Sequence, residues 1–413
     1  MKQYQALFLQ ILRAAIHGEY ITESIPLSRD LLELADRQYV LPMICETVHP
    51  SVSAKGGLFI YYKKIAVDST VLQYVKSKEI LPYYSALVRN GLHPLVVKGM
   101  VCRQLYPHPE ERLSVDEDIL IPAGEMEQCD RLLKSMGMQP DPEAPAGSRN
   151  FEVSYYDHEK GQYLEVHTSL FDPASELFSG WNAFFSDCYV QPRKRVIYDT
   201  DIWTLPDTDH LFYLILHVLK HFLHSGFGIR QVCDICLFSC ANAGSIDWER
   251  LRERCGKVHS IPFVTALFKI GCQYLLSEAQ ADILRSRWSM EPEQDTDALL
   301  SDILEGGITG NSSLDRLHSS SMTLQAAMGK GDMADRVLRT VFPSAKELSK
   351  RYPYLEKAPA LLPAAWISRI MEYMRESRIR DKGGGNASET VRIAGERIRL
   401  LSQYGLLPEN RNK

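Results

Sequence analysis

The sequence predicts an α+β fold, with a small mixed-sheet core flanked by N- and C-terminal helical regions. Apolar residues recur at helical spacing through residues 1–91. Short strand-like runs then alternate with short helices in residues 92–205, a pattern typical of a mixed sheet. Helical spacing returns in residues 206–345, and a helical tail occupies residues 346–413. We therefore expect four parts with these boundaries.

Composition limits the possible classes of protein. The 413 residues are enough for more than one packed core, and the formal net charge of −5 gives no overall basic field for nucleic acid. No apolar run reaches the roughly 20 residues that span a bilayer, and the first helix is amphipathic rather than a signal peptide. The nine cysteines lack disulfide-like spacing. We expect a cytoplasmic protein with no membrane partner.

Helices are expected in the N-terminal region around residues 7–15, 31–34, 41–48 and 59–89. Pro82 is expected to break the last of these, because its nitrogen has no N–H for the helical hydrogen bonds.

The elements of the core are read from apolar runs and from the glycines and prolines that separate them. Strands are expected over Leu95–Val97, Val115–Ile121, Phe151–Tyr156 and Tyr163–Leu170, and helices over Met100–Tyr106 and Gly124–Met136. Farther along the chain, helices are expected over residues 207–223, 230–241 and 388–401.

Three carboxylates are the main candidates for chemistry. Asp116 and Asp118 stand two residues apart at the start of an apolar run, so on a strand both point to the same side. Glu165 lies in another strand-like run and shares one face with His167. Like charges held close together favour a divalent cation between them. We expect Asp116, Asp118 and Glu165 to bind Mg²⁺ or Mn²⁺; the alternative is solvated acids at strand ends.

Lys98-Gly99 lies between a strand and a short helix, directly before the carboxylate strand. Free N–H groups and the positive dipole end at the helix start attract anions, Gly99 permits close approach, and Lys98 adds a full charge. This favours phosphate binding. The alternative is a plain turn in which Gly99 supplies backbone freedom.

The order of these motifs resembles a known family. The chain carries Leu95-Val-Val-Lys-Gly-Met100, Leu105-Tyr-Pro, Arg112-x-x-x-Asp116-x-Asp118 and Leu164-Glu-Val-His-Thr, followed by similar stretches over residues 211–234 and 351–366. This set resembles the uncharacterised nucleotidyltransferase family of the DNA polymerase β-like nucleotidyltransferase superfamily. By that resemblance, Asp116, Asp118 and Glu165 are the metal ligands, and Lys98-Gly99 occupies the place of the superfamily's Gly-Ser phosphate turn.

The chain departs from the family pattern at two places. Glu117 stands where members usually carry an aliphatic residue, which indicates an edge strand or the start of a loop. The turn at Lys98 lacks the superfamily's serine and with it the hydroxyl group of that turn.

The resemblance implies transfer of a nucleoside monophosphate from an NTP such as ATP to an acceptor, with release of pyrophosphate. Lys98, Gly99, Arg112, His167, His217 and His221 are the expected nucleotide-binding residues. Glu165 is also expected to help deprotonate the acceptor, which is an unknown small molecule, sugar, peptide or protein. The alternative is a nucleotide-binding or regulatory protein of the same fold without catalysis.

Other clusters have simpler readings. His217, His221 and His224 share one helix face, but the adjacent His-Asp pair of an HD-type phosphohydrolase is absent from the sequence. Cys233, Cys236 and Cys240 fit one buried helix stripe better than a metal site. Arg230 and Asp234 are four residues apart, which favours an ion pair across one helical turn. The basic run Arg193-Lys194-Arg195 is typical of a solvated face.

Overall fold

The structure is a computed structural model. It describes residues 1–23, 25–48, 57–141, 151–175, 177–224, 226–290, 296–307, 352, 361 and 387–406. The chain forms two compact units, one made of Met1–Val218 with Gly228–Leu300 and the other of Leu219–Phe227 with Ser301–Lys413. The predicted α+β class is confirmed: helices surround one mixed sheet of seven strands.

The first unit begins with the predicted helices. Their bounds are α1 (Gln3–Ile16), α2 (Arg29–Arg37), α3 (Leu41–Thr47) and α5 (Gly57–Arg89). Ser28 caps α2 by accepting a hydrogen bond from the Leu31 N–H at 3.2 Å, and the apolar stripe from Leu31 to Ala35 is buried.

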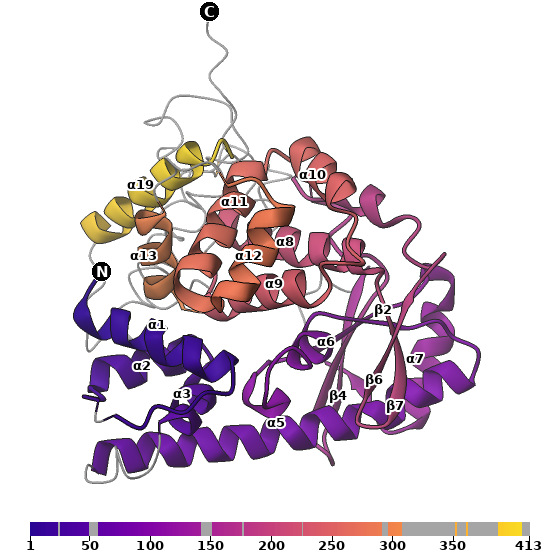
Figure 1. Cartoon of the computed structure of the whole chain (residues 1–413). Coiled ribbons are helices and arrows are strands. Elements are labelled where there is room, and N and C mark those ends of the chain that lie inside the picture. The colour runs from indigo at the N-terminus through magenta and orange to yellow at the C-terminus, as the bar shows by residue number, and fades with distance from the viewer. Residues whose placement is uncertain are drawn as a thin grey trace, which may run out of the picture. The chain divides into compact units, whose positions relative to one another are not determined.

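The long helix α5 passes through Pro82 without a break, so the predicted interruption is wrong. A proline inside a helix costs about 3 kcal/mol. Its buried neighbours Ile80 and Leu81 each contribute about 2 kcal/mol of apolar burial, and Tyr83 and Tyr84 are buried beside them. Tertiary packing therefore outweighs the lost hydrogen bond. In Figure 1, α5 runs along the N-terminal helices at one end and reaches the sheet at the other.

The sheet has the strand order β3-β4-β5-β2-β1-β7-β6. The bounds are β1 (Leu95–Val97), β2 (Glu117–Leu120), β3 (Gln139–Pro140), β4 (Glu152–Asp157), β5 (Gln162–His167), β6 (Arg193–Ile197) and β7 (Thr200–Thr204). The pairs β1–β7 and β2–β5 are parallel, and the other neighbouring pairs are antiparallel. Short helices α6 (Gly99–Arg103) and α7 (Met126–Ser135) connect the strands.

Strand β2 is central and all four of its residues are buried, so the edge position that Glu117 suggested is wrong. The hairpin β6–β7 was not predicted. Its two-residue turn is formed by Tyr198 and Asp199, both with positive φ, and contains no glycine that would mark it in the sequence.

Helices follow the sheet, as predicted. They are α8 (Asp207–His224), α9 (Ile229–Ala241), α10 (Trp248–Lys257), α11 (Ile261–Ile270), α12 (Glu278–Arg287) and α13 (Asp297–Gly306). Shorter helical turns occupy Pro109–Glu111, Ala123–Glu125, Ser179–Phe185 and Gly271–Leu275. In the described part of the chain, no helix combines the length and apolar character needed to cross a membrane.

The second unit contains the end of α8 and the helix α19 (Ala387–Gln403), which matches the predicted helix over residues 388–401. Arg397 of α19 is buried and donates to the carbonyls of Phe222 at 2.6 Å and His224 at 3.2 Å. This guanidinium therefore satisfies carbonyls that the end of α8 leaves open. Apart from residues 352 and 361, the family-like stretch 351–366 lies outside the described residues.

Candidate active site

The turn after β1 places an unusual backbone conformation at Lys98, not at Gly99. Lys98 has φ 55° and ψ −115°. A Cβ at Gly99 would lie 3.1 Å from Oε2 of Glu117 and 3.5 Å from the carbonyl oxygen of Asp116. A side chain at position 99 would therefore crowd the Glu117 carboxylate, whereas the unusual backbone conformation that was expected at Gly99 is found at Lys98.

A buried histidine supports this turn. The Lys98 N–H donates to Nε2 of His210 at 3.2 Å, and Nδ1 of His210 lies 3.0 Å from Oγ1 of Thr204. That hydroxyl in turn donates to the carbonyl of Val96 at 2.6 Å. Burial lowers the pKa of His210 to about 3, so the ring is neutral and Nε2 can accept. No spacing in the sequence connects His210 to Lys98.

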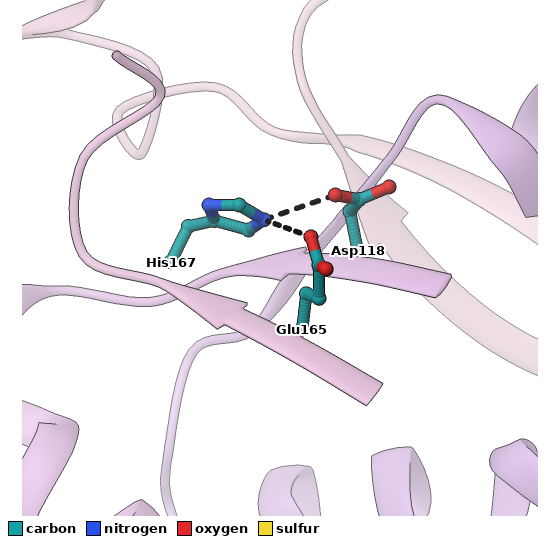
Figure 2. Close-up of side chains that lie close together, drawn as sticks. All are labelled: Asp118, Glu165 and His167. Carbon is teal, nitrogen blue, oxygen red and sulfur yellow. Dashed lines mark hydrogen bonds and ion pairs between the residues drawn. The ribbon is translucent and has the colours of Figure 1, made fainter. Parts of the chain in front are cut away.

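The register of the sheet brings two of the three predicted carboxylates together. Asp118 of β2 lies opposite Glu165 of the parallel strand β5 and opposite Val97 of β1. Partners in register project to the same face, so the Asp118 and Glu165 side chains are neighbours. Figure 2 shows them with His167.

His167 links this cluster. Its Nε2 lies 2.9 Å from Oδ1 of Asp118 and 3.6 Å from Oε2 of Glu165, and its Nδ1 lies 3.5 Å from Oε2 of Glu152. One potential ligand atom from each of Asp118, Glu165 and His167 lies within 4.8 Å of the others. The predicted shared face of Glu165 and His167 is therefore present.

Charge at the cluster is balanced within the protein. The Nζ atom of Lys98 lies 2.9 Å from Oδ1 of Asp118. Burial alone would raise the pKa of Asp118, but Lys98 and the hydrogen bond from His167 outweigh it and lower that pKa to about 2. Burial would lower the pKa of His167, yet its hydrogen bond to Asp118 and the nearby carboxylate of Glu165 raise it to about 9. Both cations are thus held at one buried carboxylate.

Asp116 lies just before β2 and stands apart from this group. It is half-buried, its oxygens are not among the three mutually close ligand atoms, and it makes no hydrogen bond to any described residue. Burial and the charge of Asp118 raise its pKa to about 6, although Lys98 opposes them. The third predicted carboxylate is therefore within electrostatic reach of the others and lacks a partner.

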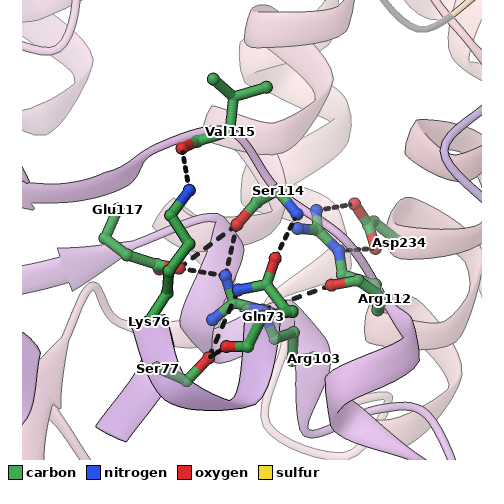
Figure 3. A network of polar contacts seen from close by, with 9 residues as sticks. All are labelled: Gln73, Lys76, Ser77, Arg103, Arg112, Ser114, Val115, Glu117 and Asp234. Carbon is green, nitrogen blue, oxygen red and sulfur yellow. Dashed lines mark hydrogen bonds and ion pairs between the residues drawn. The ribbon is translucent and has the colours of Figure 1, made fainter. Parts of the chain in front are cut away.

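The segment that carries Asp116 into β2 is fixed by a buried polar network (Figure 3). Glu117 faces away from its two aspartate neighbours and pairs with Arg103 of α6. Ser114 donates through its N–H to Oε1 of Gln73 at 2.7 Å and contacts both members of that pair. Lys76 holds the Val115 carbonyl at 3.0 Å. Gln73 and Lys76 belong to α5, so that helix helps to position the carboxylates.

Arg112 is not part of the carboxylate cluster. It is buried and contacts Asp234 of α9 twice, with Nη2 to Oδ2 at 2.5 Å and Nε to Oδ1 at 3.2 Å. The Tyr106 hydroxyl donates to the same carboxylate at 2.8 Å. The expected pair between Arg230 and Asp234 does not form, because Arg112 and Tyr106 occupy that carboxylate.

The predicted histidines lie on α8. The ring of His217 is 6.0 Å from that of Tyr213, and the charge of Lys98 acts on the Tyr213 hydroxyl, so His217 is one helical turn from a neighbour of the cluster. His221 belongs to the second unit. Cys233 and Cys236 are buried, as expected for core residues, whereas Cys240 is half-buried.

Comparison with known proteins identifies the family of this chain. A sequence profile described as uncharacterised nucleotidyltransferase matches residues 28–270. A solution structure of the antibiotic-resistance factor ANT(2'')-Ia is 12% identical with a TM-score of 0.31, over 46% of this chain and 91% of the other. A nucleotidyltransferase-like antigen from Paracoccidioides brasiliensis is 15% identical with a TM-score of 0.30, over 51% and 96%. Curated proteins give no significant match. On the profile match, which spans more than half of its length, the chain belongs to the uncharacterised nucleotidyltransferase family.

Proposed function

We propose that this protein transfers a nucleoside monophosphate from an NTP, such as ATP, to an acceptor hydroxyl or phosphate and releases pyrophosphate. The observation that carries the proposal is the register pairing of Asp118 with Glu165, beside Lys98, in a member of this family. The acceptor is a small molecule, sugar, peptide or protein. A cytoplasmic location remains a prediction from the sequence.

The donor set suits a divalent cation. Asp116, Asp118 and Glu165 offer hard carboxylate oxygens, which both Mg²⁺ and Mn²⁺ accept as ligands. The unpartnered, half-buried Asp116 supports the fit, because its repulsion with Asp118 is what a cation would relieve. When bound, the ion supplies neutralisation of the charge that develops on the phosphates.

The protein residues then have separate tasks. Asp116, Asp118 and Glu165 hold the ion, and His167 orients Asp118 through its hydrogen bond. Lys98 supplies positive charge beside the phosphates. Gly99 has no side chain, so the phosphates can approach the backbone of the turn closely. An oxygen of Glu165 accepts the proton of the attacking hydroxyl.

Of the other predicted nucleotide-binding residues, His217 and His221 stay candidates for phosphate contact. Arg112 also stays a candidate, and its buried pair with Asp234 supports a positioning task for it.

The test uses nucleotides labelled at either the α- or the γ-phosphate, with Mg²⁺ or Mn²⁺ and a panel of acceptors that includes the protein itself. Nucleotidyl transfer moves the α-label to the acceptor and leaves the γ-label in pyrophosphate. Asp118→Asn should abolish this, whereas Asp130→Asn on α7 serves as a matched control. Transfer of the γ-label instead, or full activity of Asp118→Asn, would refute the proposal.

A second candidate is a nucleotide-binding protein without catalysis. One observation favours it: Oδ1 of Asp118 is already engaged by both Lys98 and His167, so an incoming ion must compete with them. Calorimetry with ATP, CTP, GTP and UTP, with and without Mg²⁺, separates the two candidates. Metal-dependent binding with no product from any acceptor supports the binder.

A further inference from the structure

Arg230 is a buried arginine that has no counterion among the described residues. It is the second residue of α9 and only 9% exposed. Its Nε and Nη1 atoms are buried and have no hydrogen-bond partner in the part of the chain that the structure describes. A buried charge that lacks a partner is strongly unfavourable, so its persistence points to a ligand that completes it.

The nearest carboxylate on the same helix is not available. Asp234, one turn away, has both oxygens engaged by Arg112, and Tyr106 donates to one of them. The guanidinium groups of Arg112 and Arg230 therefore have one nearby carboxylate, that of Asp234, between them. One positive charge is not neutralised by any described residue. The Tyr39 ring lies 5.9 Å from Cζ of Arg230, which gives only a weaker cation–π contact. Burial and the charge of Arg112 lower the pKa of Arg230 to about 10.

The unpaired arginine lies within electrostatic reach of the unpaired aspartate. The charge of Asp116 acts on Arg230, yet the two make no ion pair. The N-terminus of a 13-residue helix adds a positive dipole end at the same place. Its first amides are occupied, since Gly228 donates to Gln231 and Ile229 to Gln38. The guanidinium is therefore the principal group offered to an anion.

We propose that Arg230, at the N-terminus of α9, binds the terminal phosphates of the nucleotide while the carboxylates around Asp116 hold the accompanying cation. This inference rests on the proposed function and extends it. In a metal–polyphosphate, the negative phosphates would pair with Arg230 and the cation would pair with Asp116. Arg guanidinium suits the task because its planar fork matches phosphate oxygens.

Tripolyphosphate is the probe, because it carries the phosphates without a base or a reaction. Its affinity for the full chain is measured by calorimetry, with and without Mg²⁺, for the native protein, Arg230→Gln, Arg230→Lys and the exposed control Arg131→Gln. Losing a charged hydrogen-bonding partner should weaken binding roughly tenfold to a hundredfold in Arg230→Gln. Arg131→Gln should bind like the native protein, and Arg230→Lys should fall between.

Thermal unfolding gives a readout that a structural role would not produce. Without ligand, Arg230→Gln should unfold at the same temperature as the native protein or at a higher one, because the change removes an unpaired buried charge. Tripolyphosphate should raise the unfolding temperature of the native protein more than that of Arg230→Gln. Equal affinities in the native protein and Arg230→Gln would overturn the proposal. The proposal would also be overturned if the native protein did not bind tripolyphosphate, and this outcome can be observed without any variant. If Arg230→Gln does not fold, Arg230→Lys carries the comparison.

Two further measurements show whether Arg230 binds a phosphate of the nucleotide or of the acceptor, and whether this site and the proposed reaction stand or fail separately. Tripolyphosphate should compete with ATP; simultaneous binding of both would assign the arginine to a phosphate on the acceptor and overturn the proposal. Arginine-dependent tripolyphosphate binding without nucleotidyl transfer would uphold this site while the proposed function fails. If Arg230→Gln carries out nucleotidyl transfer with an unchanged KM for the NTP, the proposed function would stand and the phosphate site at Arg230 would be refuted.

Discussion

The backbone N–H of Lys98 donates to Nε2 of His210, a ring that is fully buried 112 residues farther along the chain. The bond joins the residue with the unusual conformation at the candidate site to helix α8. It requires that His210 stay neutral, because a protonated Nε2 cannot accept a hydrogen bond.

This requirement predicts how stability depends on pH. The pKa of His210 is about 3 in the folded protein and about 6.5 when unfolded, so the unfolded state binds the extra proton first as pH falls. Its contribution to stability is complete above pH 6.5 and is lost progressively between pH 6.5 and 3. Between pH 7.5 and 5.0 the native protein should lose about 2 kcal/mol relative to His210→Gln.

Urea unfolding of both proteins at a series of pH values measures this difference, since the other titrating groups cancel in the comparison. Parallel curves for the two proteins would contradict the neutral, buried role of His210.

Asp116 should cost stability in the metal-free protein. A carboxyl whose pKa rises to about 6 on folding destabilises the folded state at higher pH, so Asp116→Asn should stabilise the protein at pH 8 by roughly 1–3 kcal/mol in the presence of EDTA. The same change should remove the rise in unfolding temperature that Mg²⁺ or Mn²⁺ produces in the native protein. A variant that is less stable in EDTA would contradict the predicted cost of the buried charge, and one that keeps the full metal response would show that the ion binds elsewhere.

The pair of Arg103 and Glu117 should be strongly coupled. Removing one member leaves the other as a buried charge, so Glu117→Gln or Arg103→Met alone should cost about 3–5 kcal/mol. The double change Arg103→Met with Glu117→Leu should cost far less than the sum of the single changes, because an apolar pair fills the same space. A double-mutant cycle of unfolding free energies measures the coupling, and additive costs would argue against it.

Gly99→Ala should be destabilising by about 1–3 kcal/mol and should reduce turnover, because the new Cβ approaches the carboxylate of Glu117 and the carbonyl of Asp116. Gly124→Ala is the matched control, since its Cβ would meet nothing within 4 Å. Equal stability of the two variants would mean that the turn can widen without cost.

Much of this fold could be predicted from residue patterns. The helices α8, α9 and α19 follow clear apolar stripes, and the alternation around Asp118 and Glu165 correctly placed each on a strand. What the sequence could not supply was register: only the parallel pairing of β2 with β5 sets Asp118 against Glu165, and no local pattern encodes that alignment.

The remaining errors concern partners far apart in sequence. Glu117 suggested an edge strand or the start of a loop because its counterion, Arg103, lies on a different element. The pair of Arg112 with Asp234 was likewise not predicted, because the two residues are distant along the chain. Pro82 looked like a helix break because the packing that overrides it is tertiary. Helix-spacing rules paired Arg230 with Asp234, whereas Arg230 makes no ion pair with any residue that the structure describes.

Helix α5 has a practical consequence for anyone who wishes to shorten this protein. It supplies Gln73 and Lys76 to the segment before β2, its Tyr83 hydroxyl donates to Asp157 at 2.5 Å, and its Tyr84 hydroxyl accepts from the Trp203 N–H at 2.7 Å. A fragment trimmed to the seven strands would forfeit all four contacts at once. The smallest unit able to keep its acidic residues in place therefore begins well upstream of the first strand.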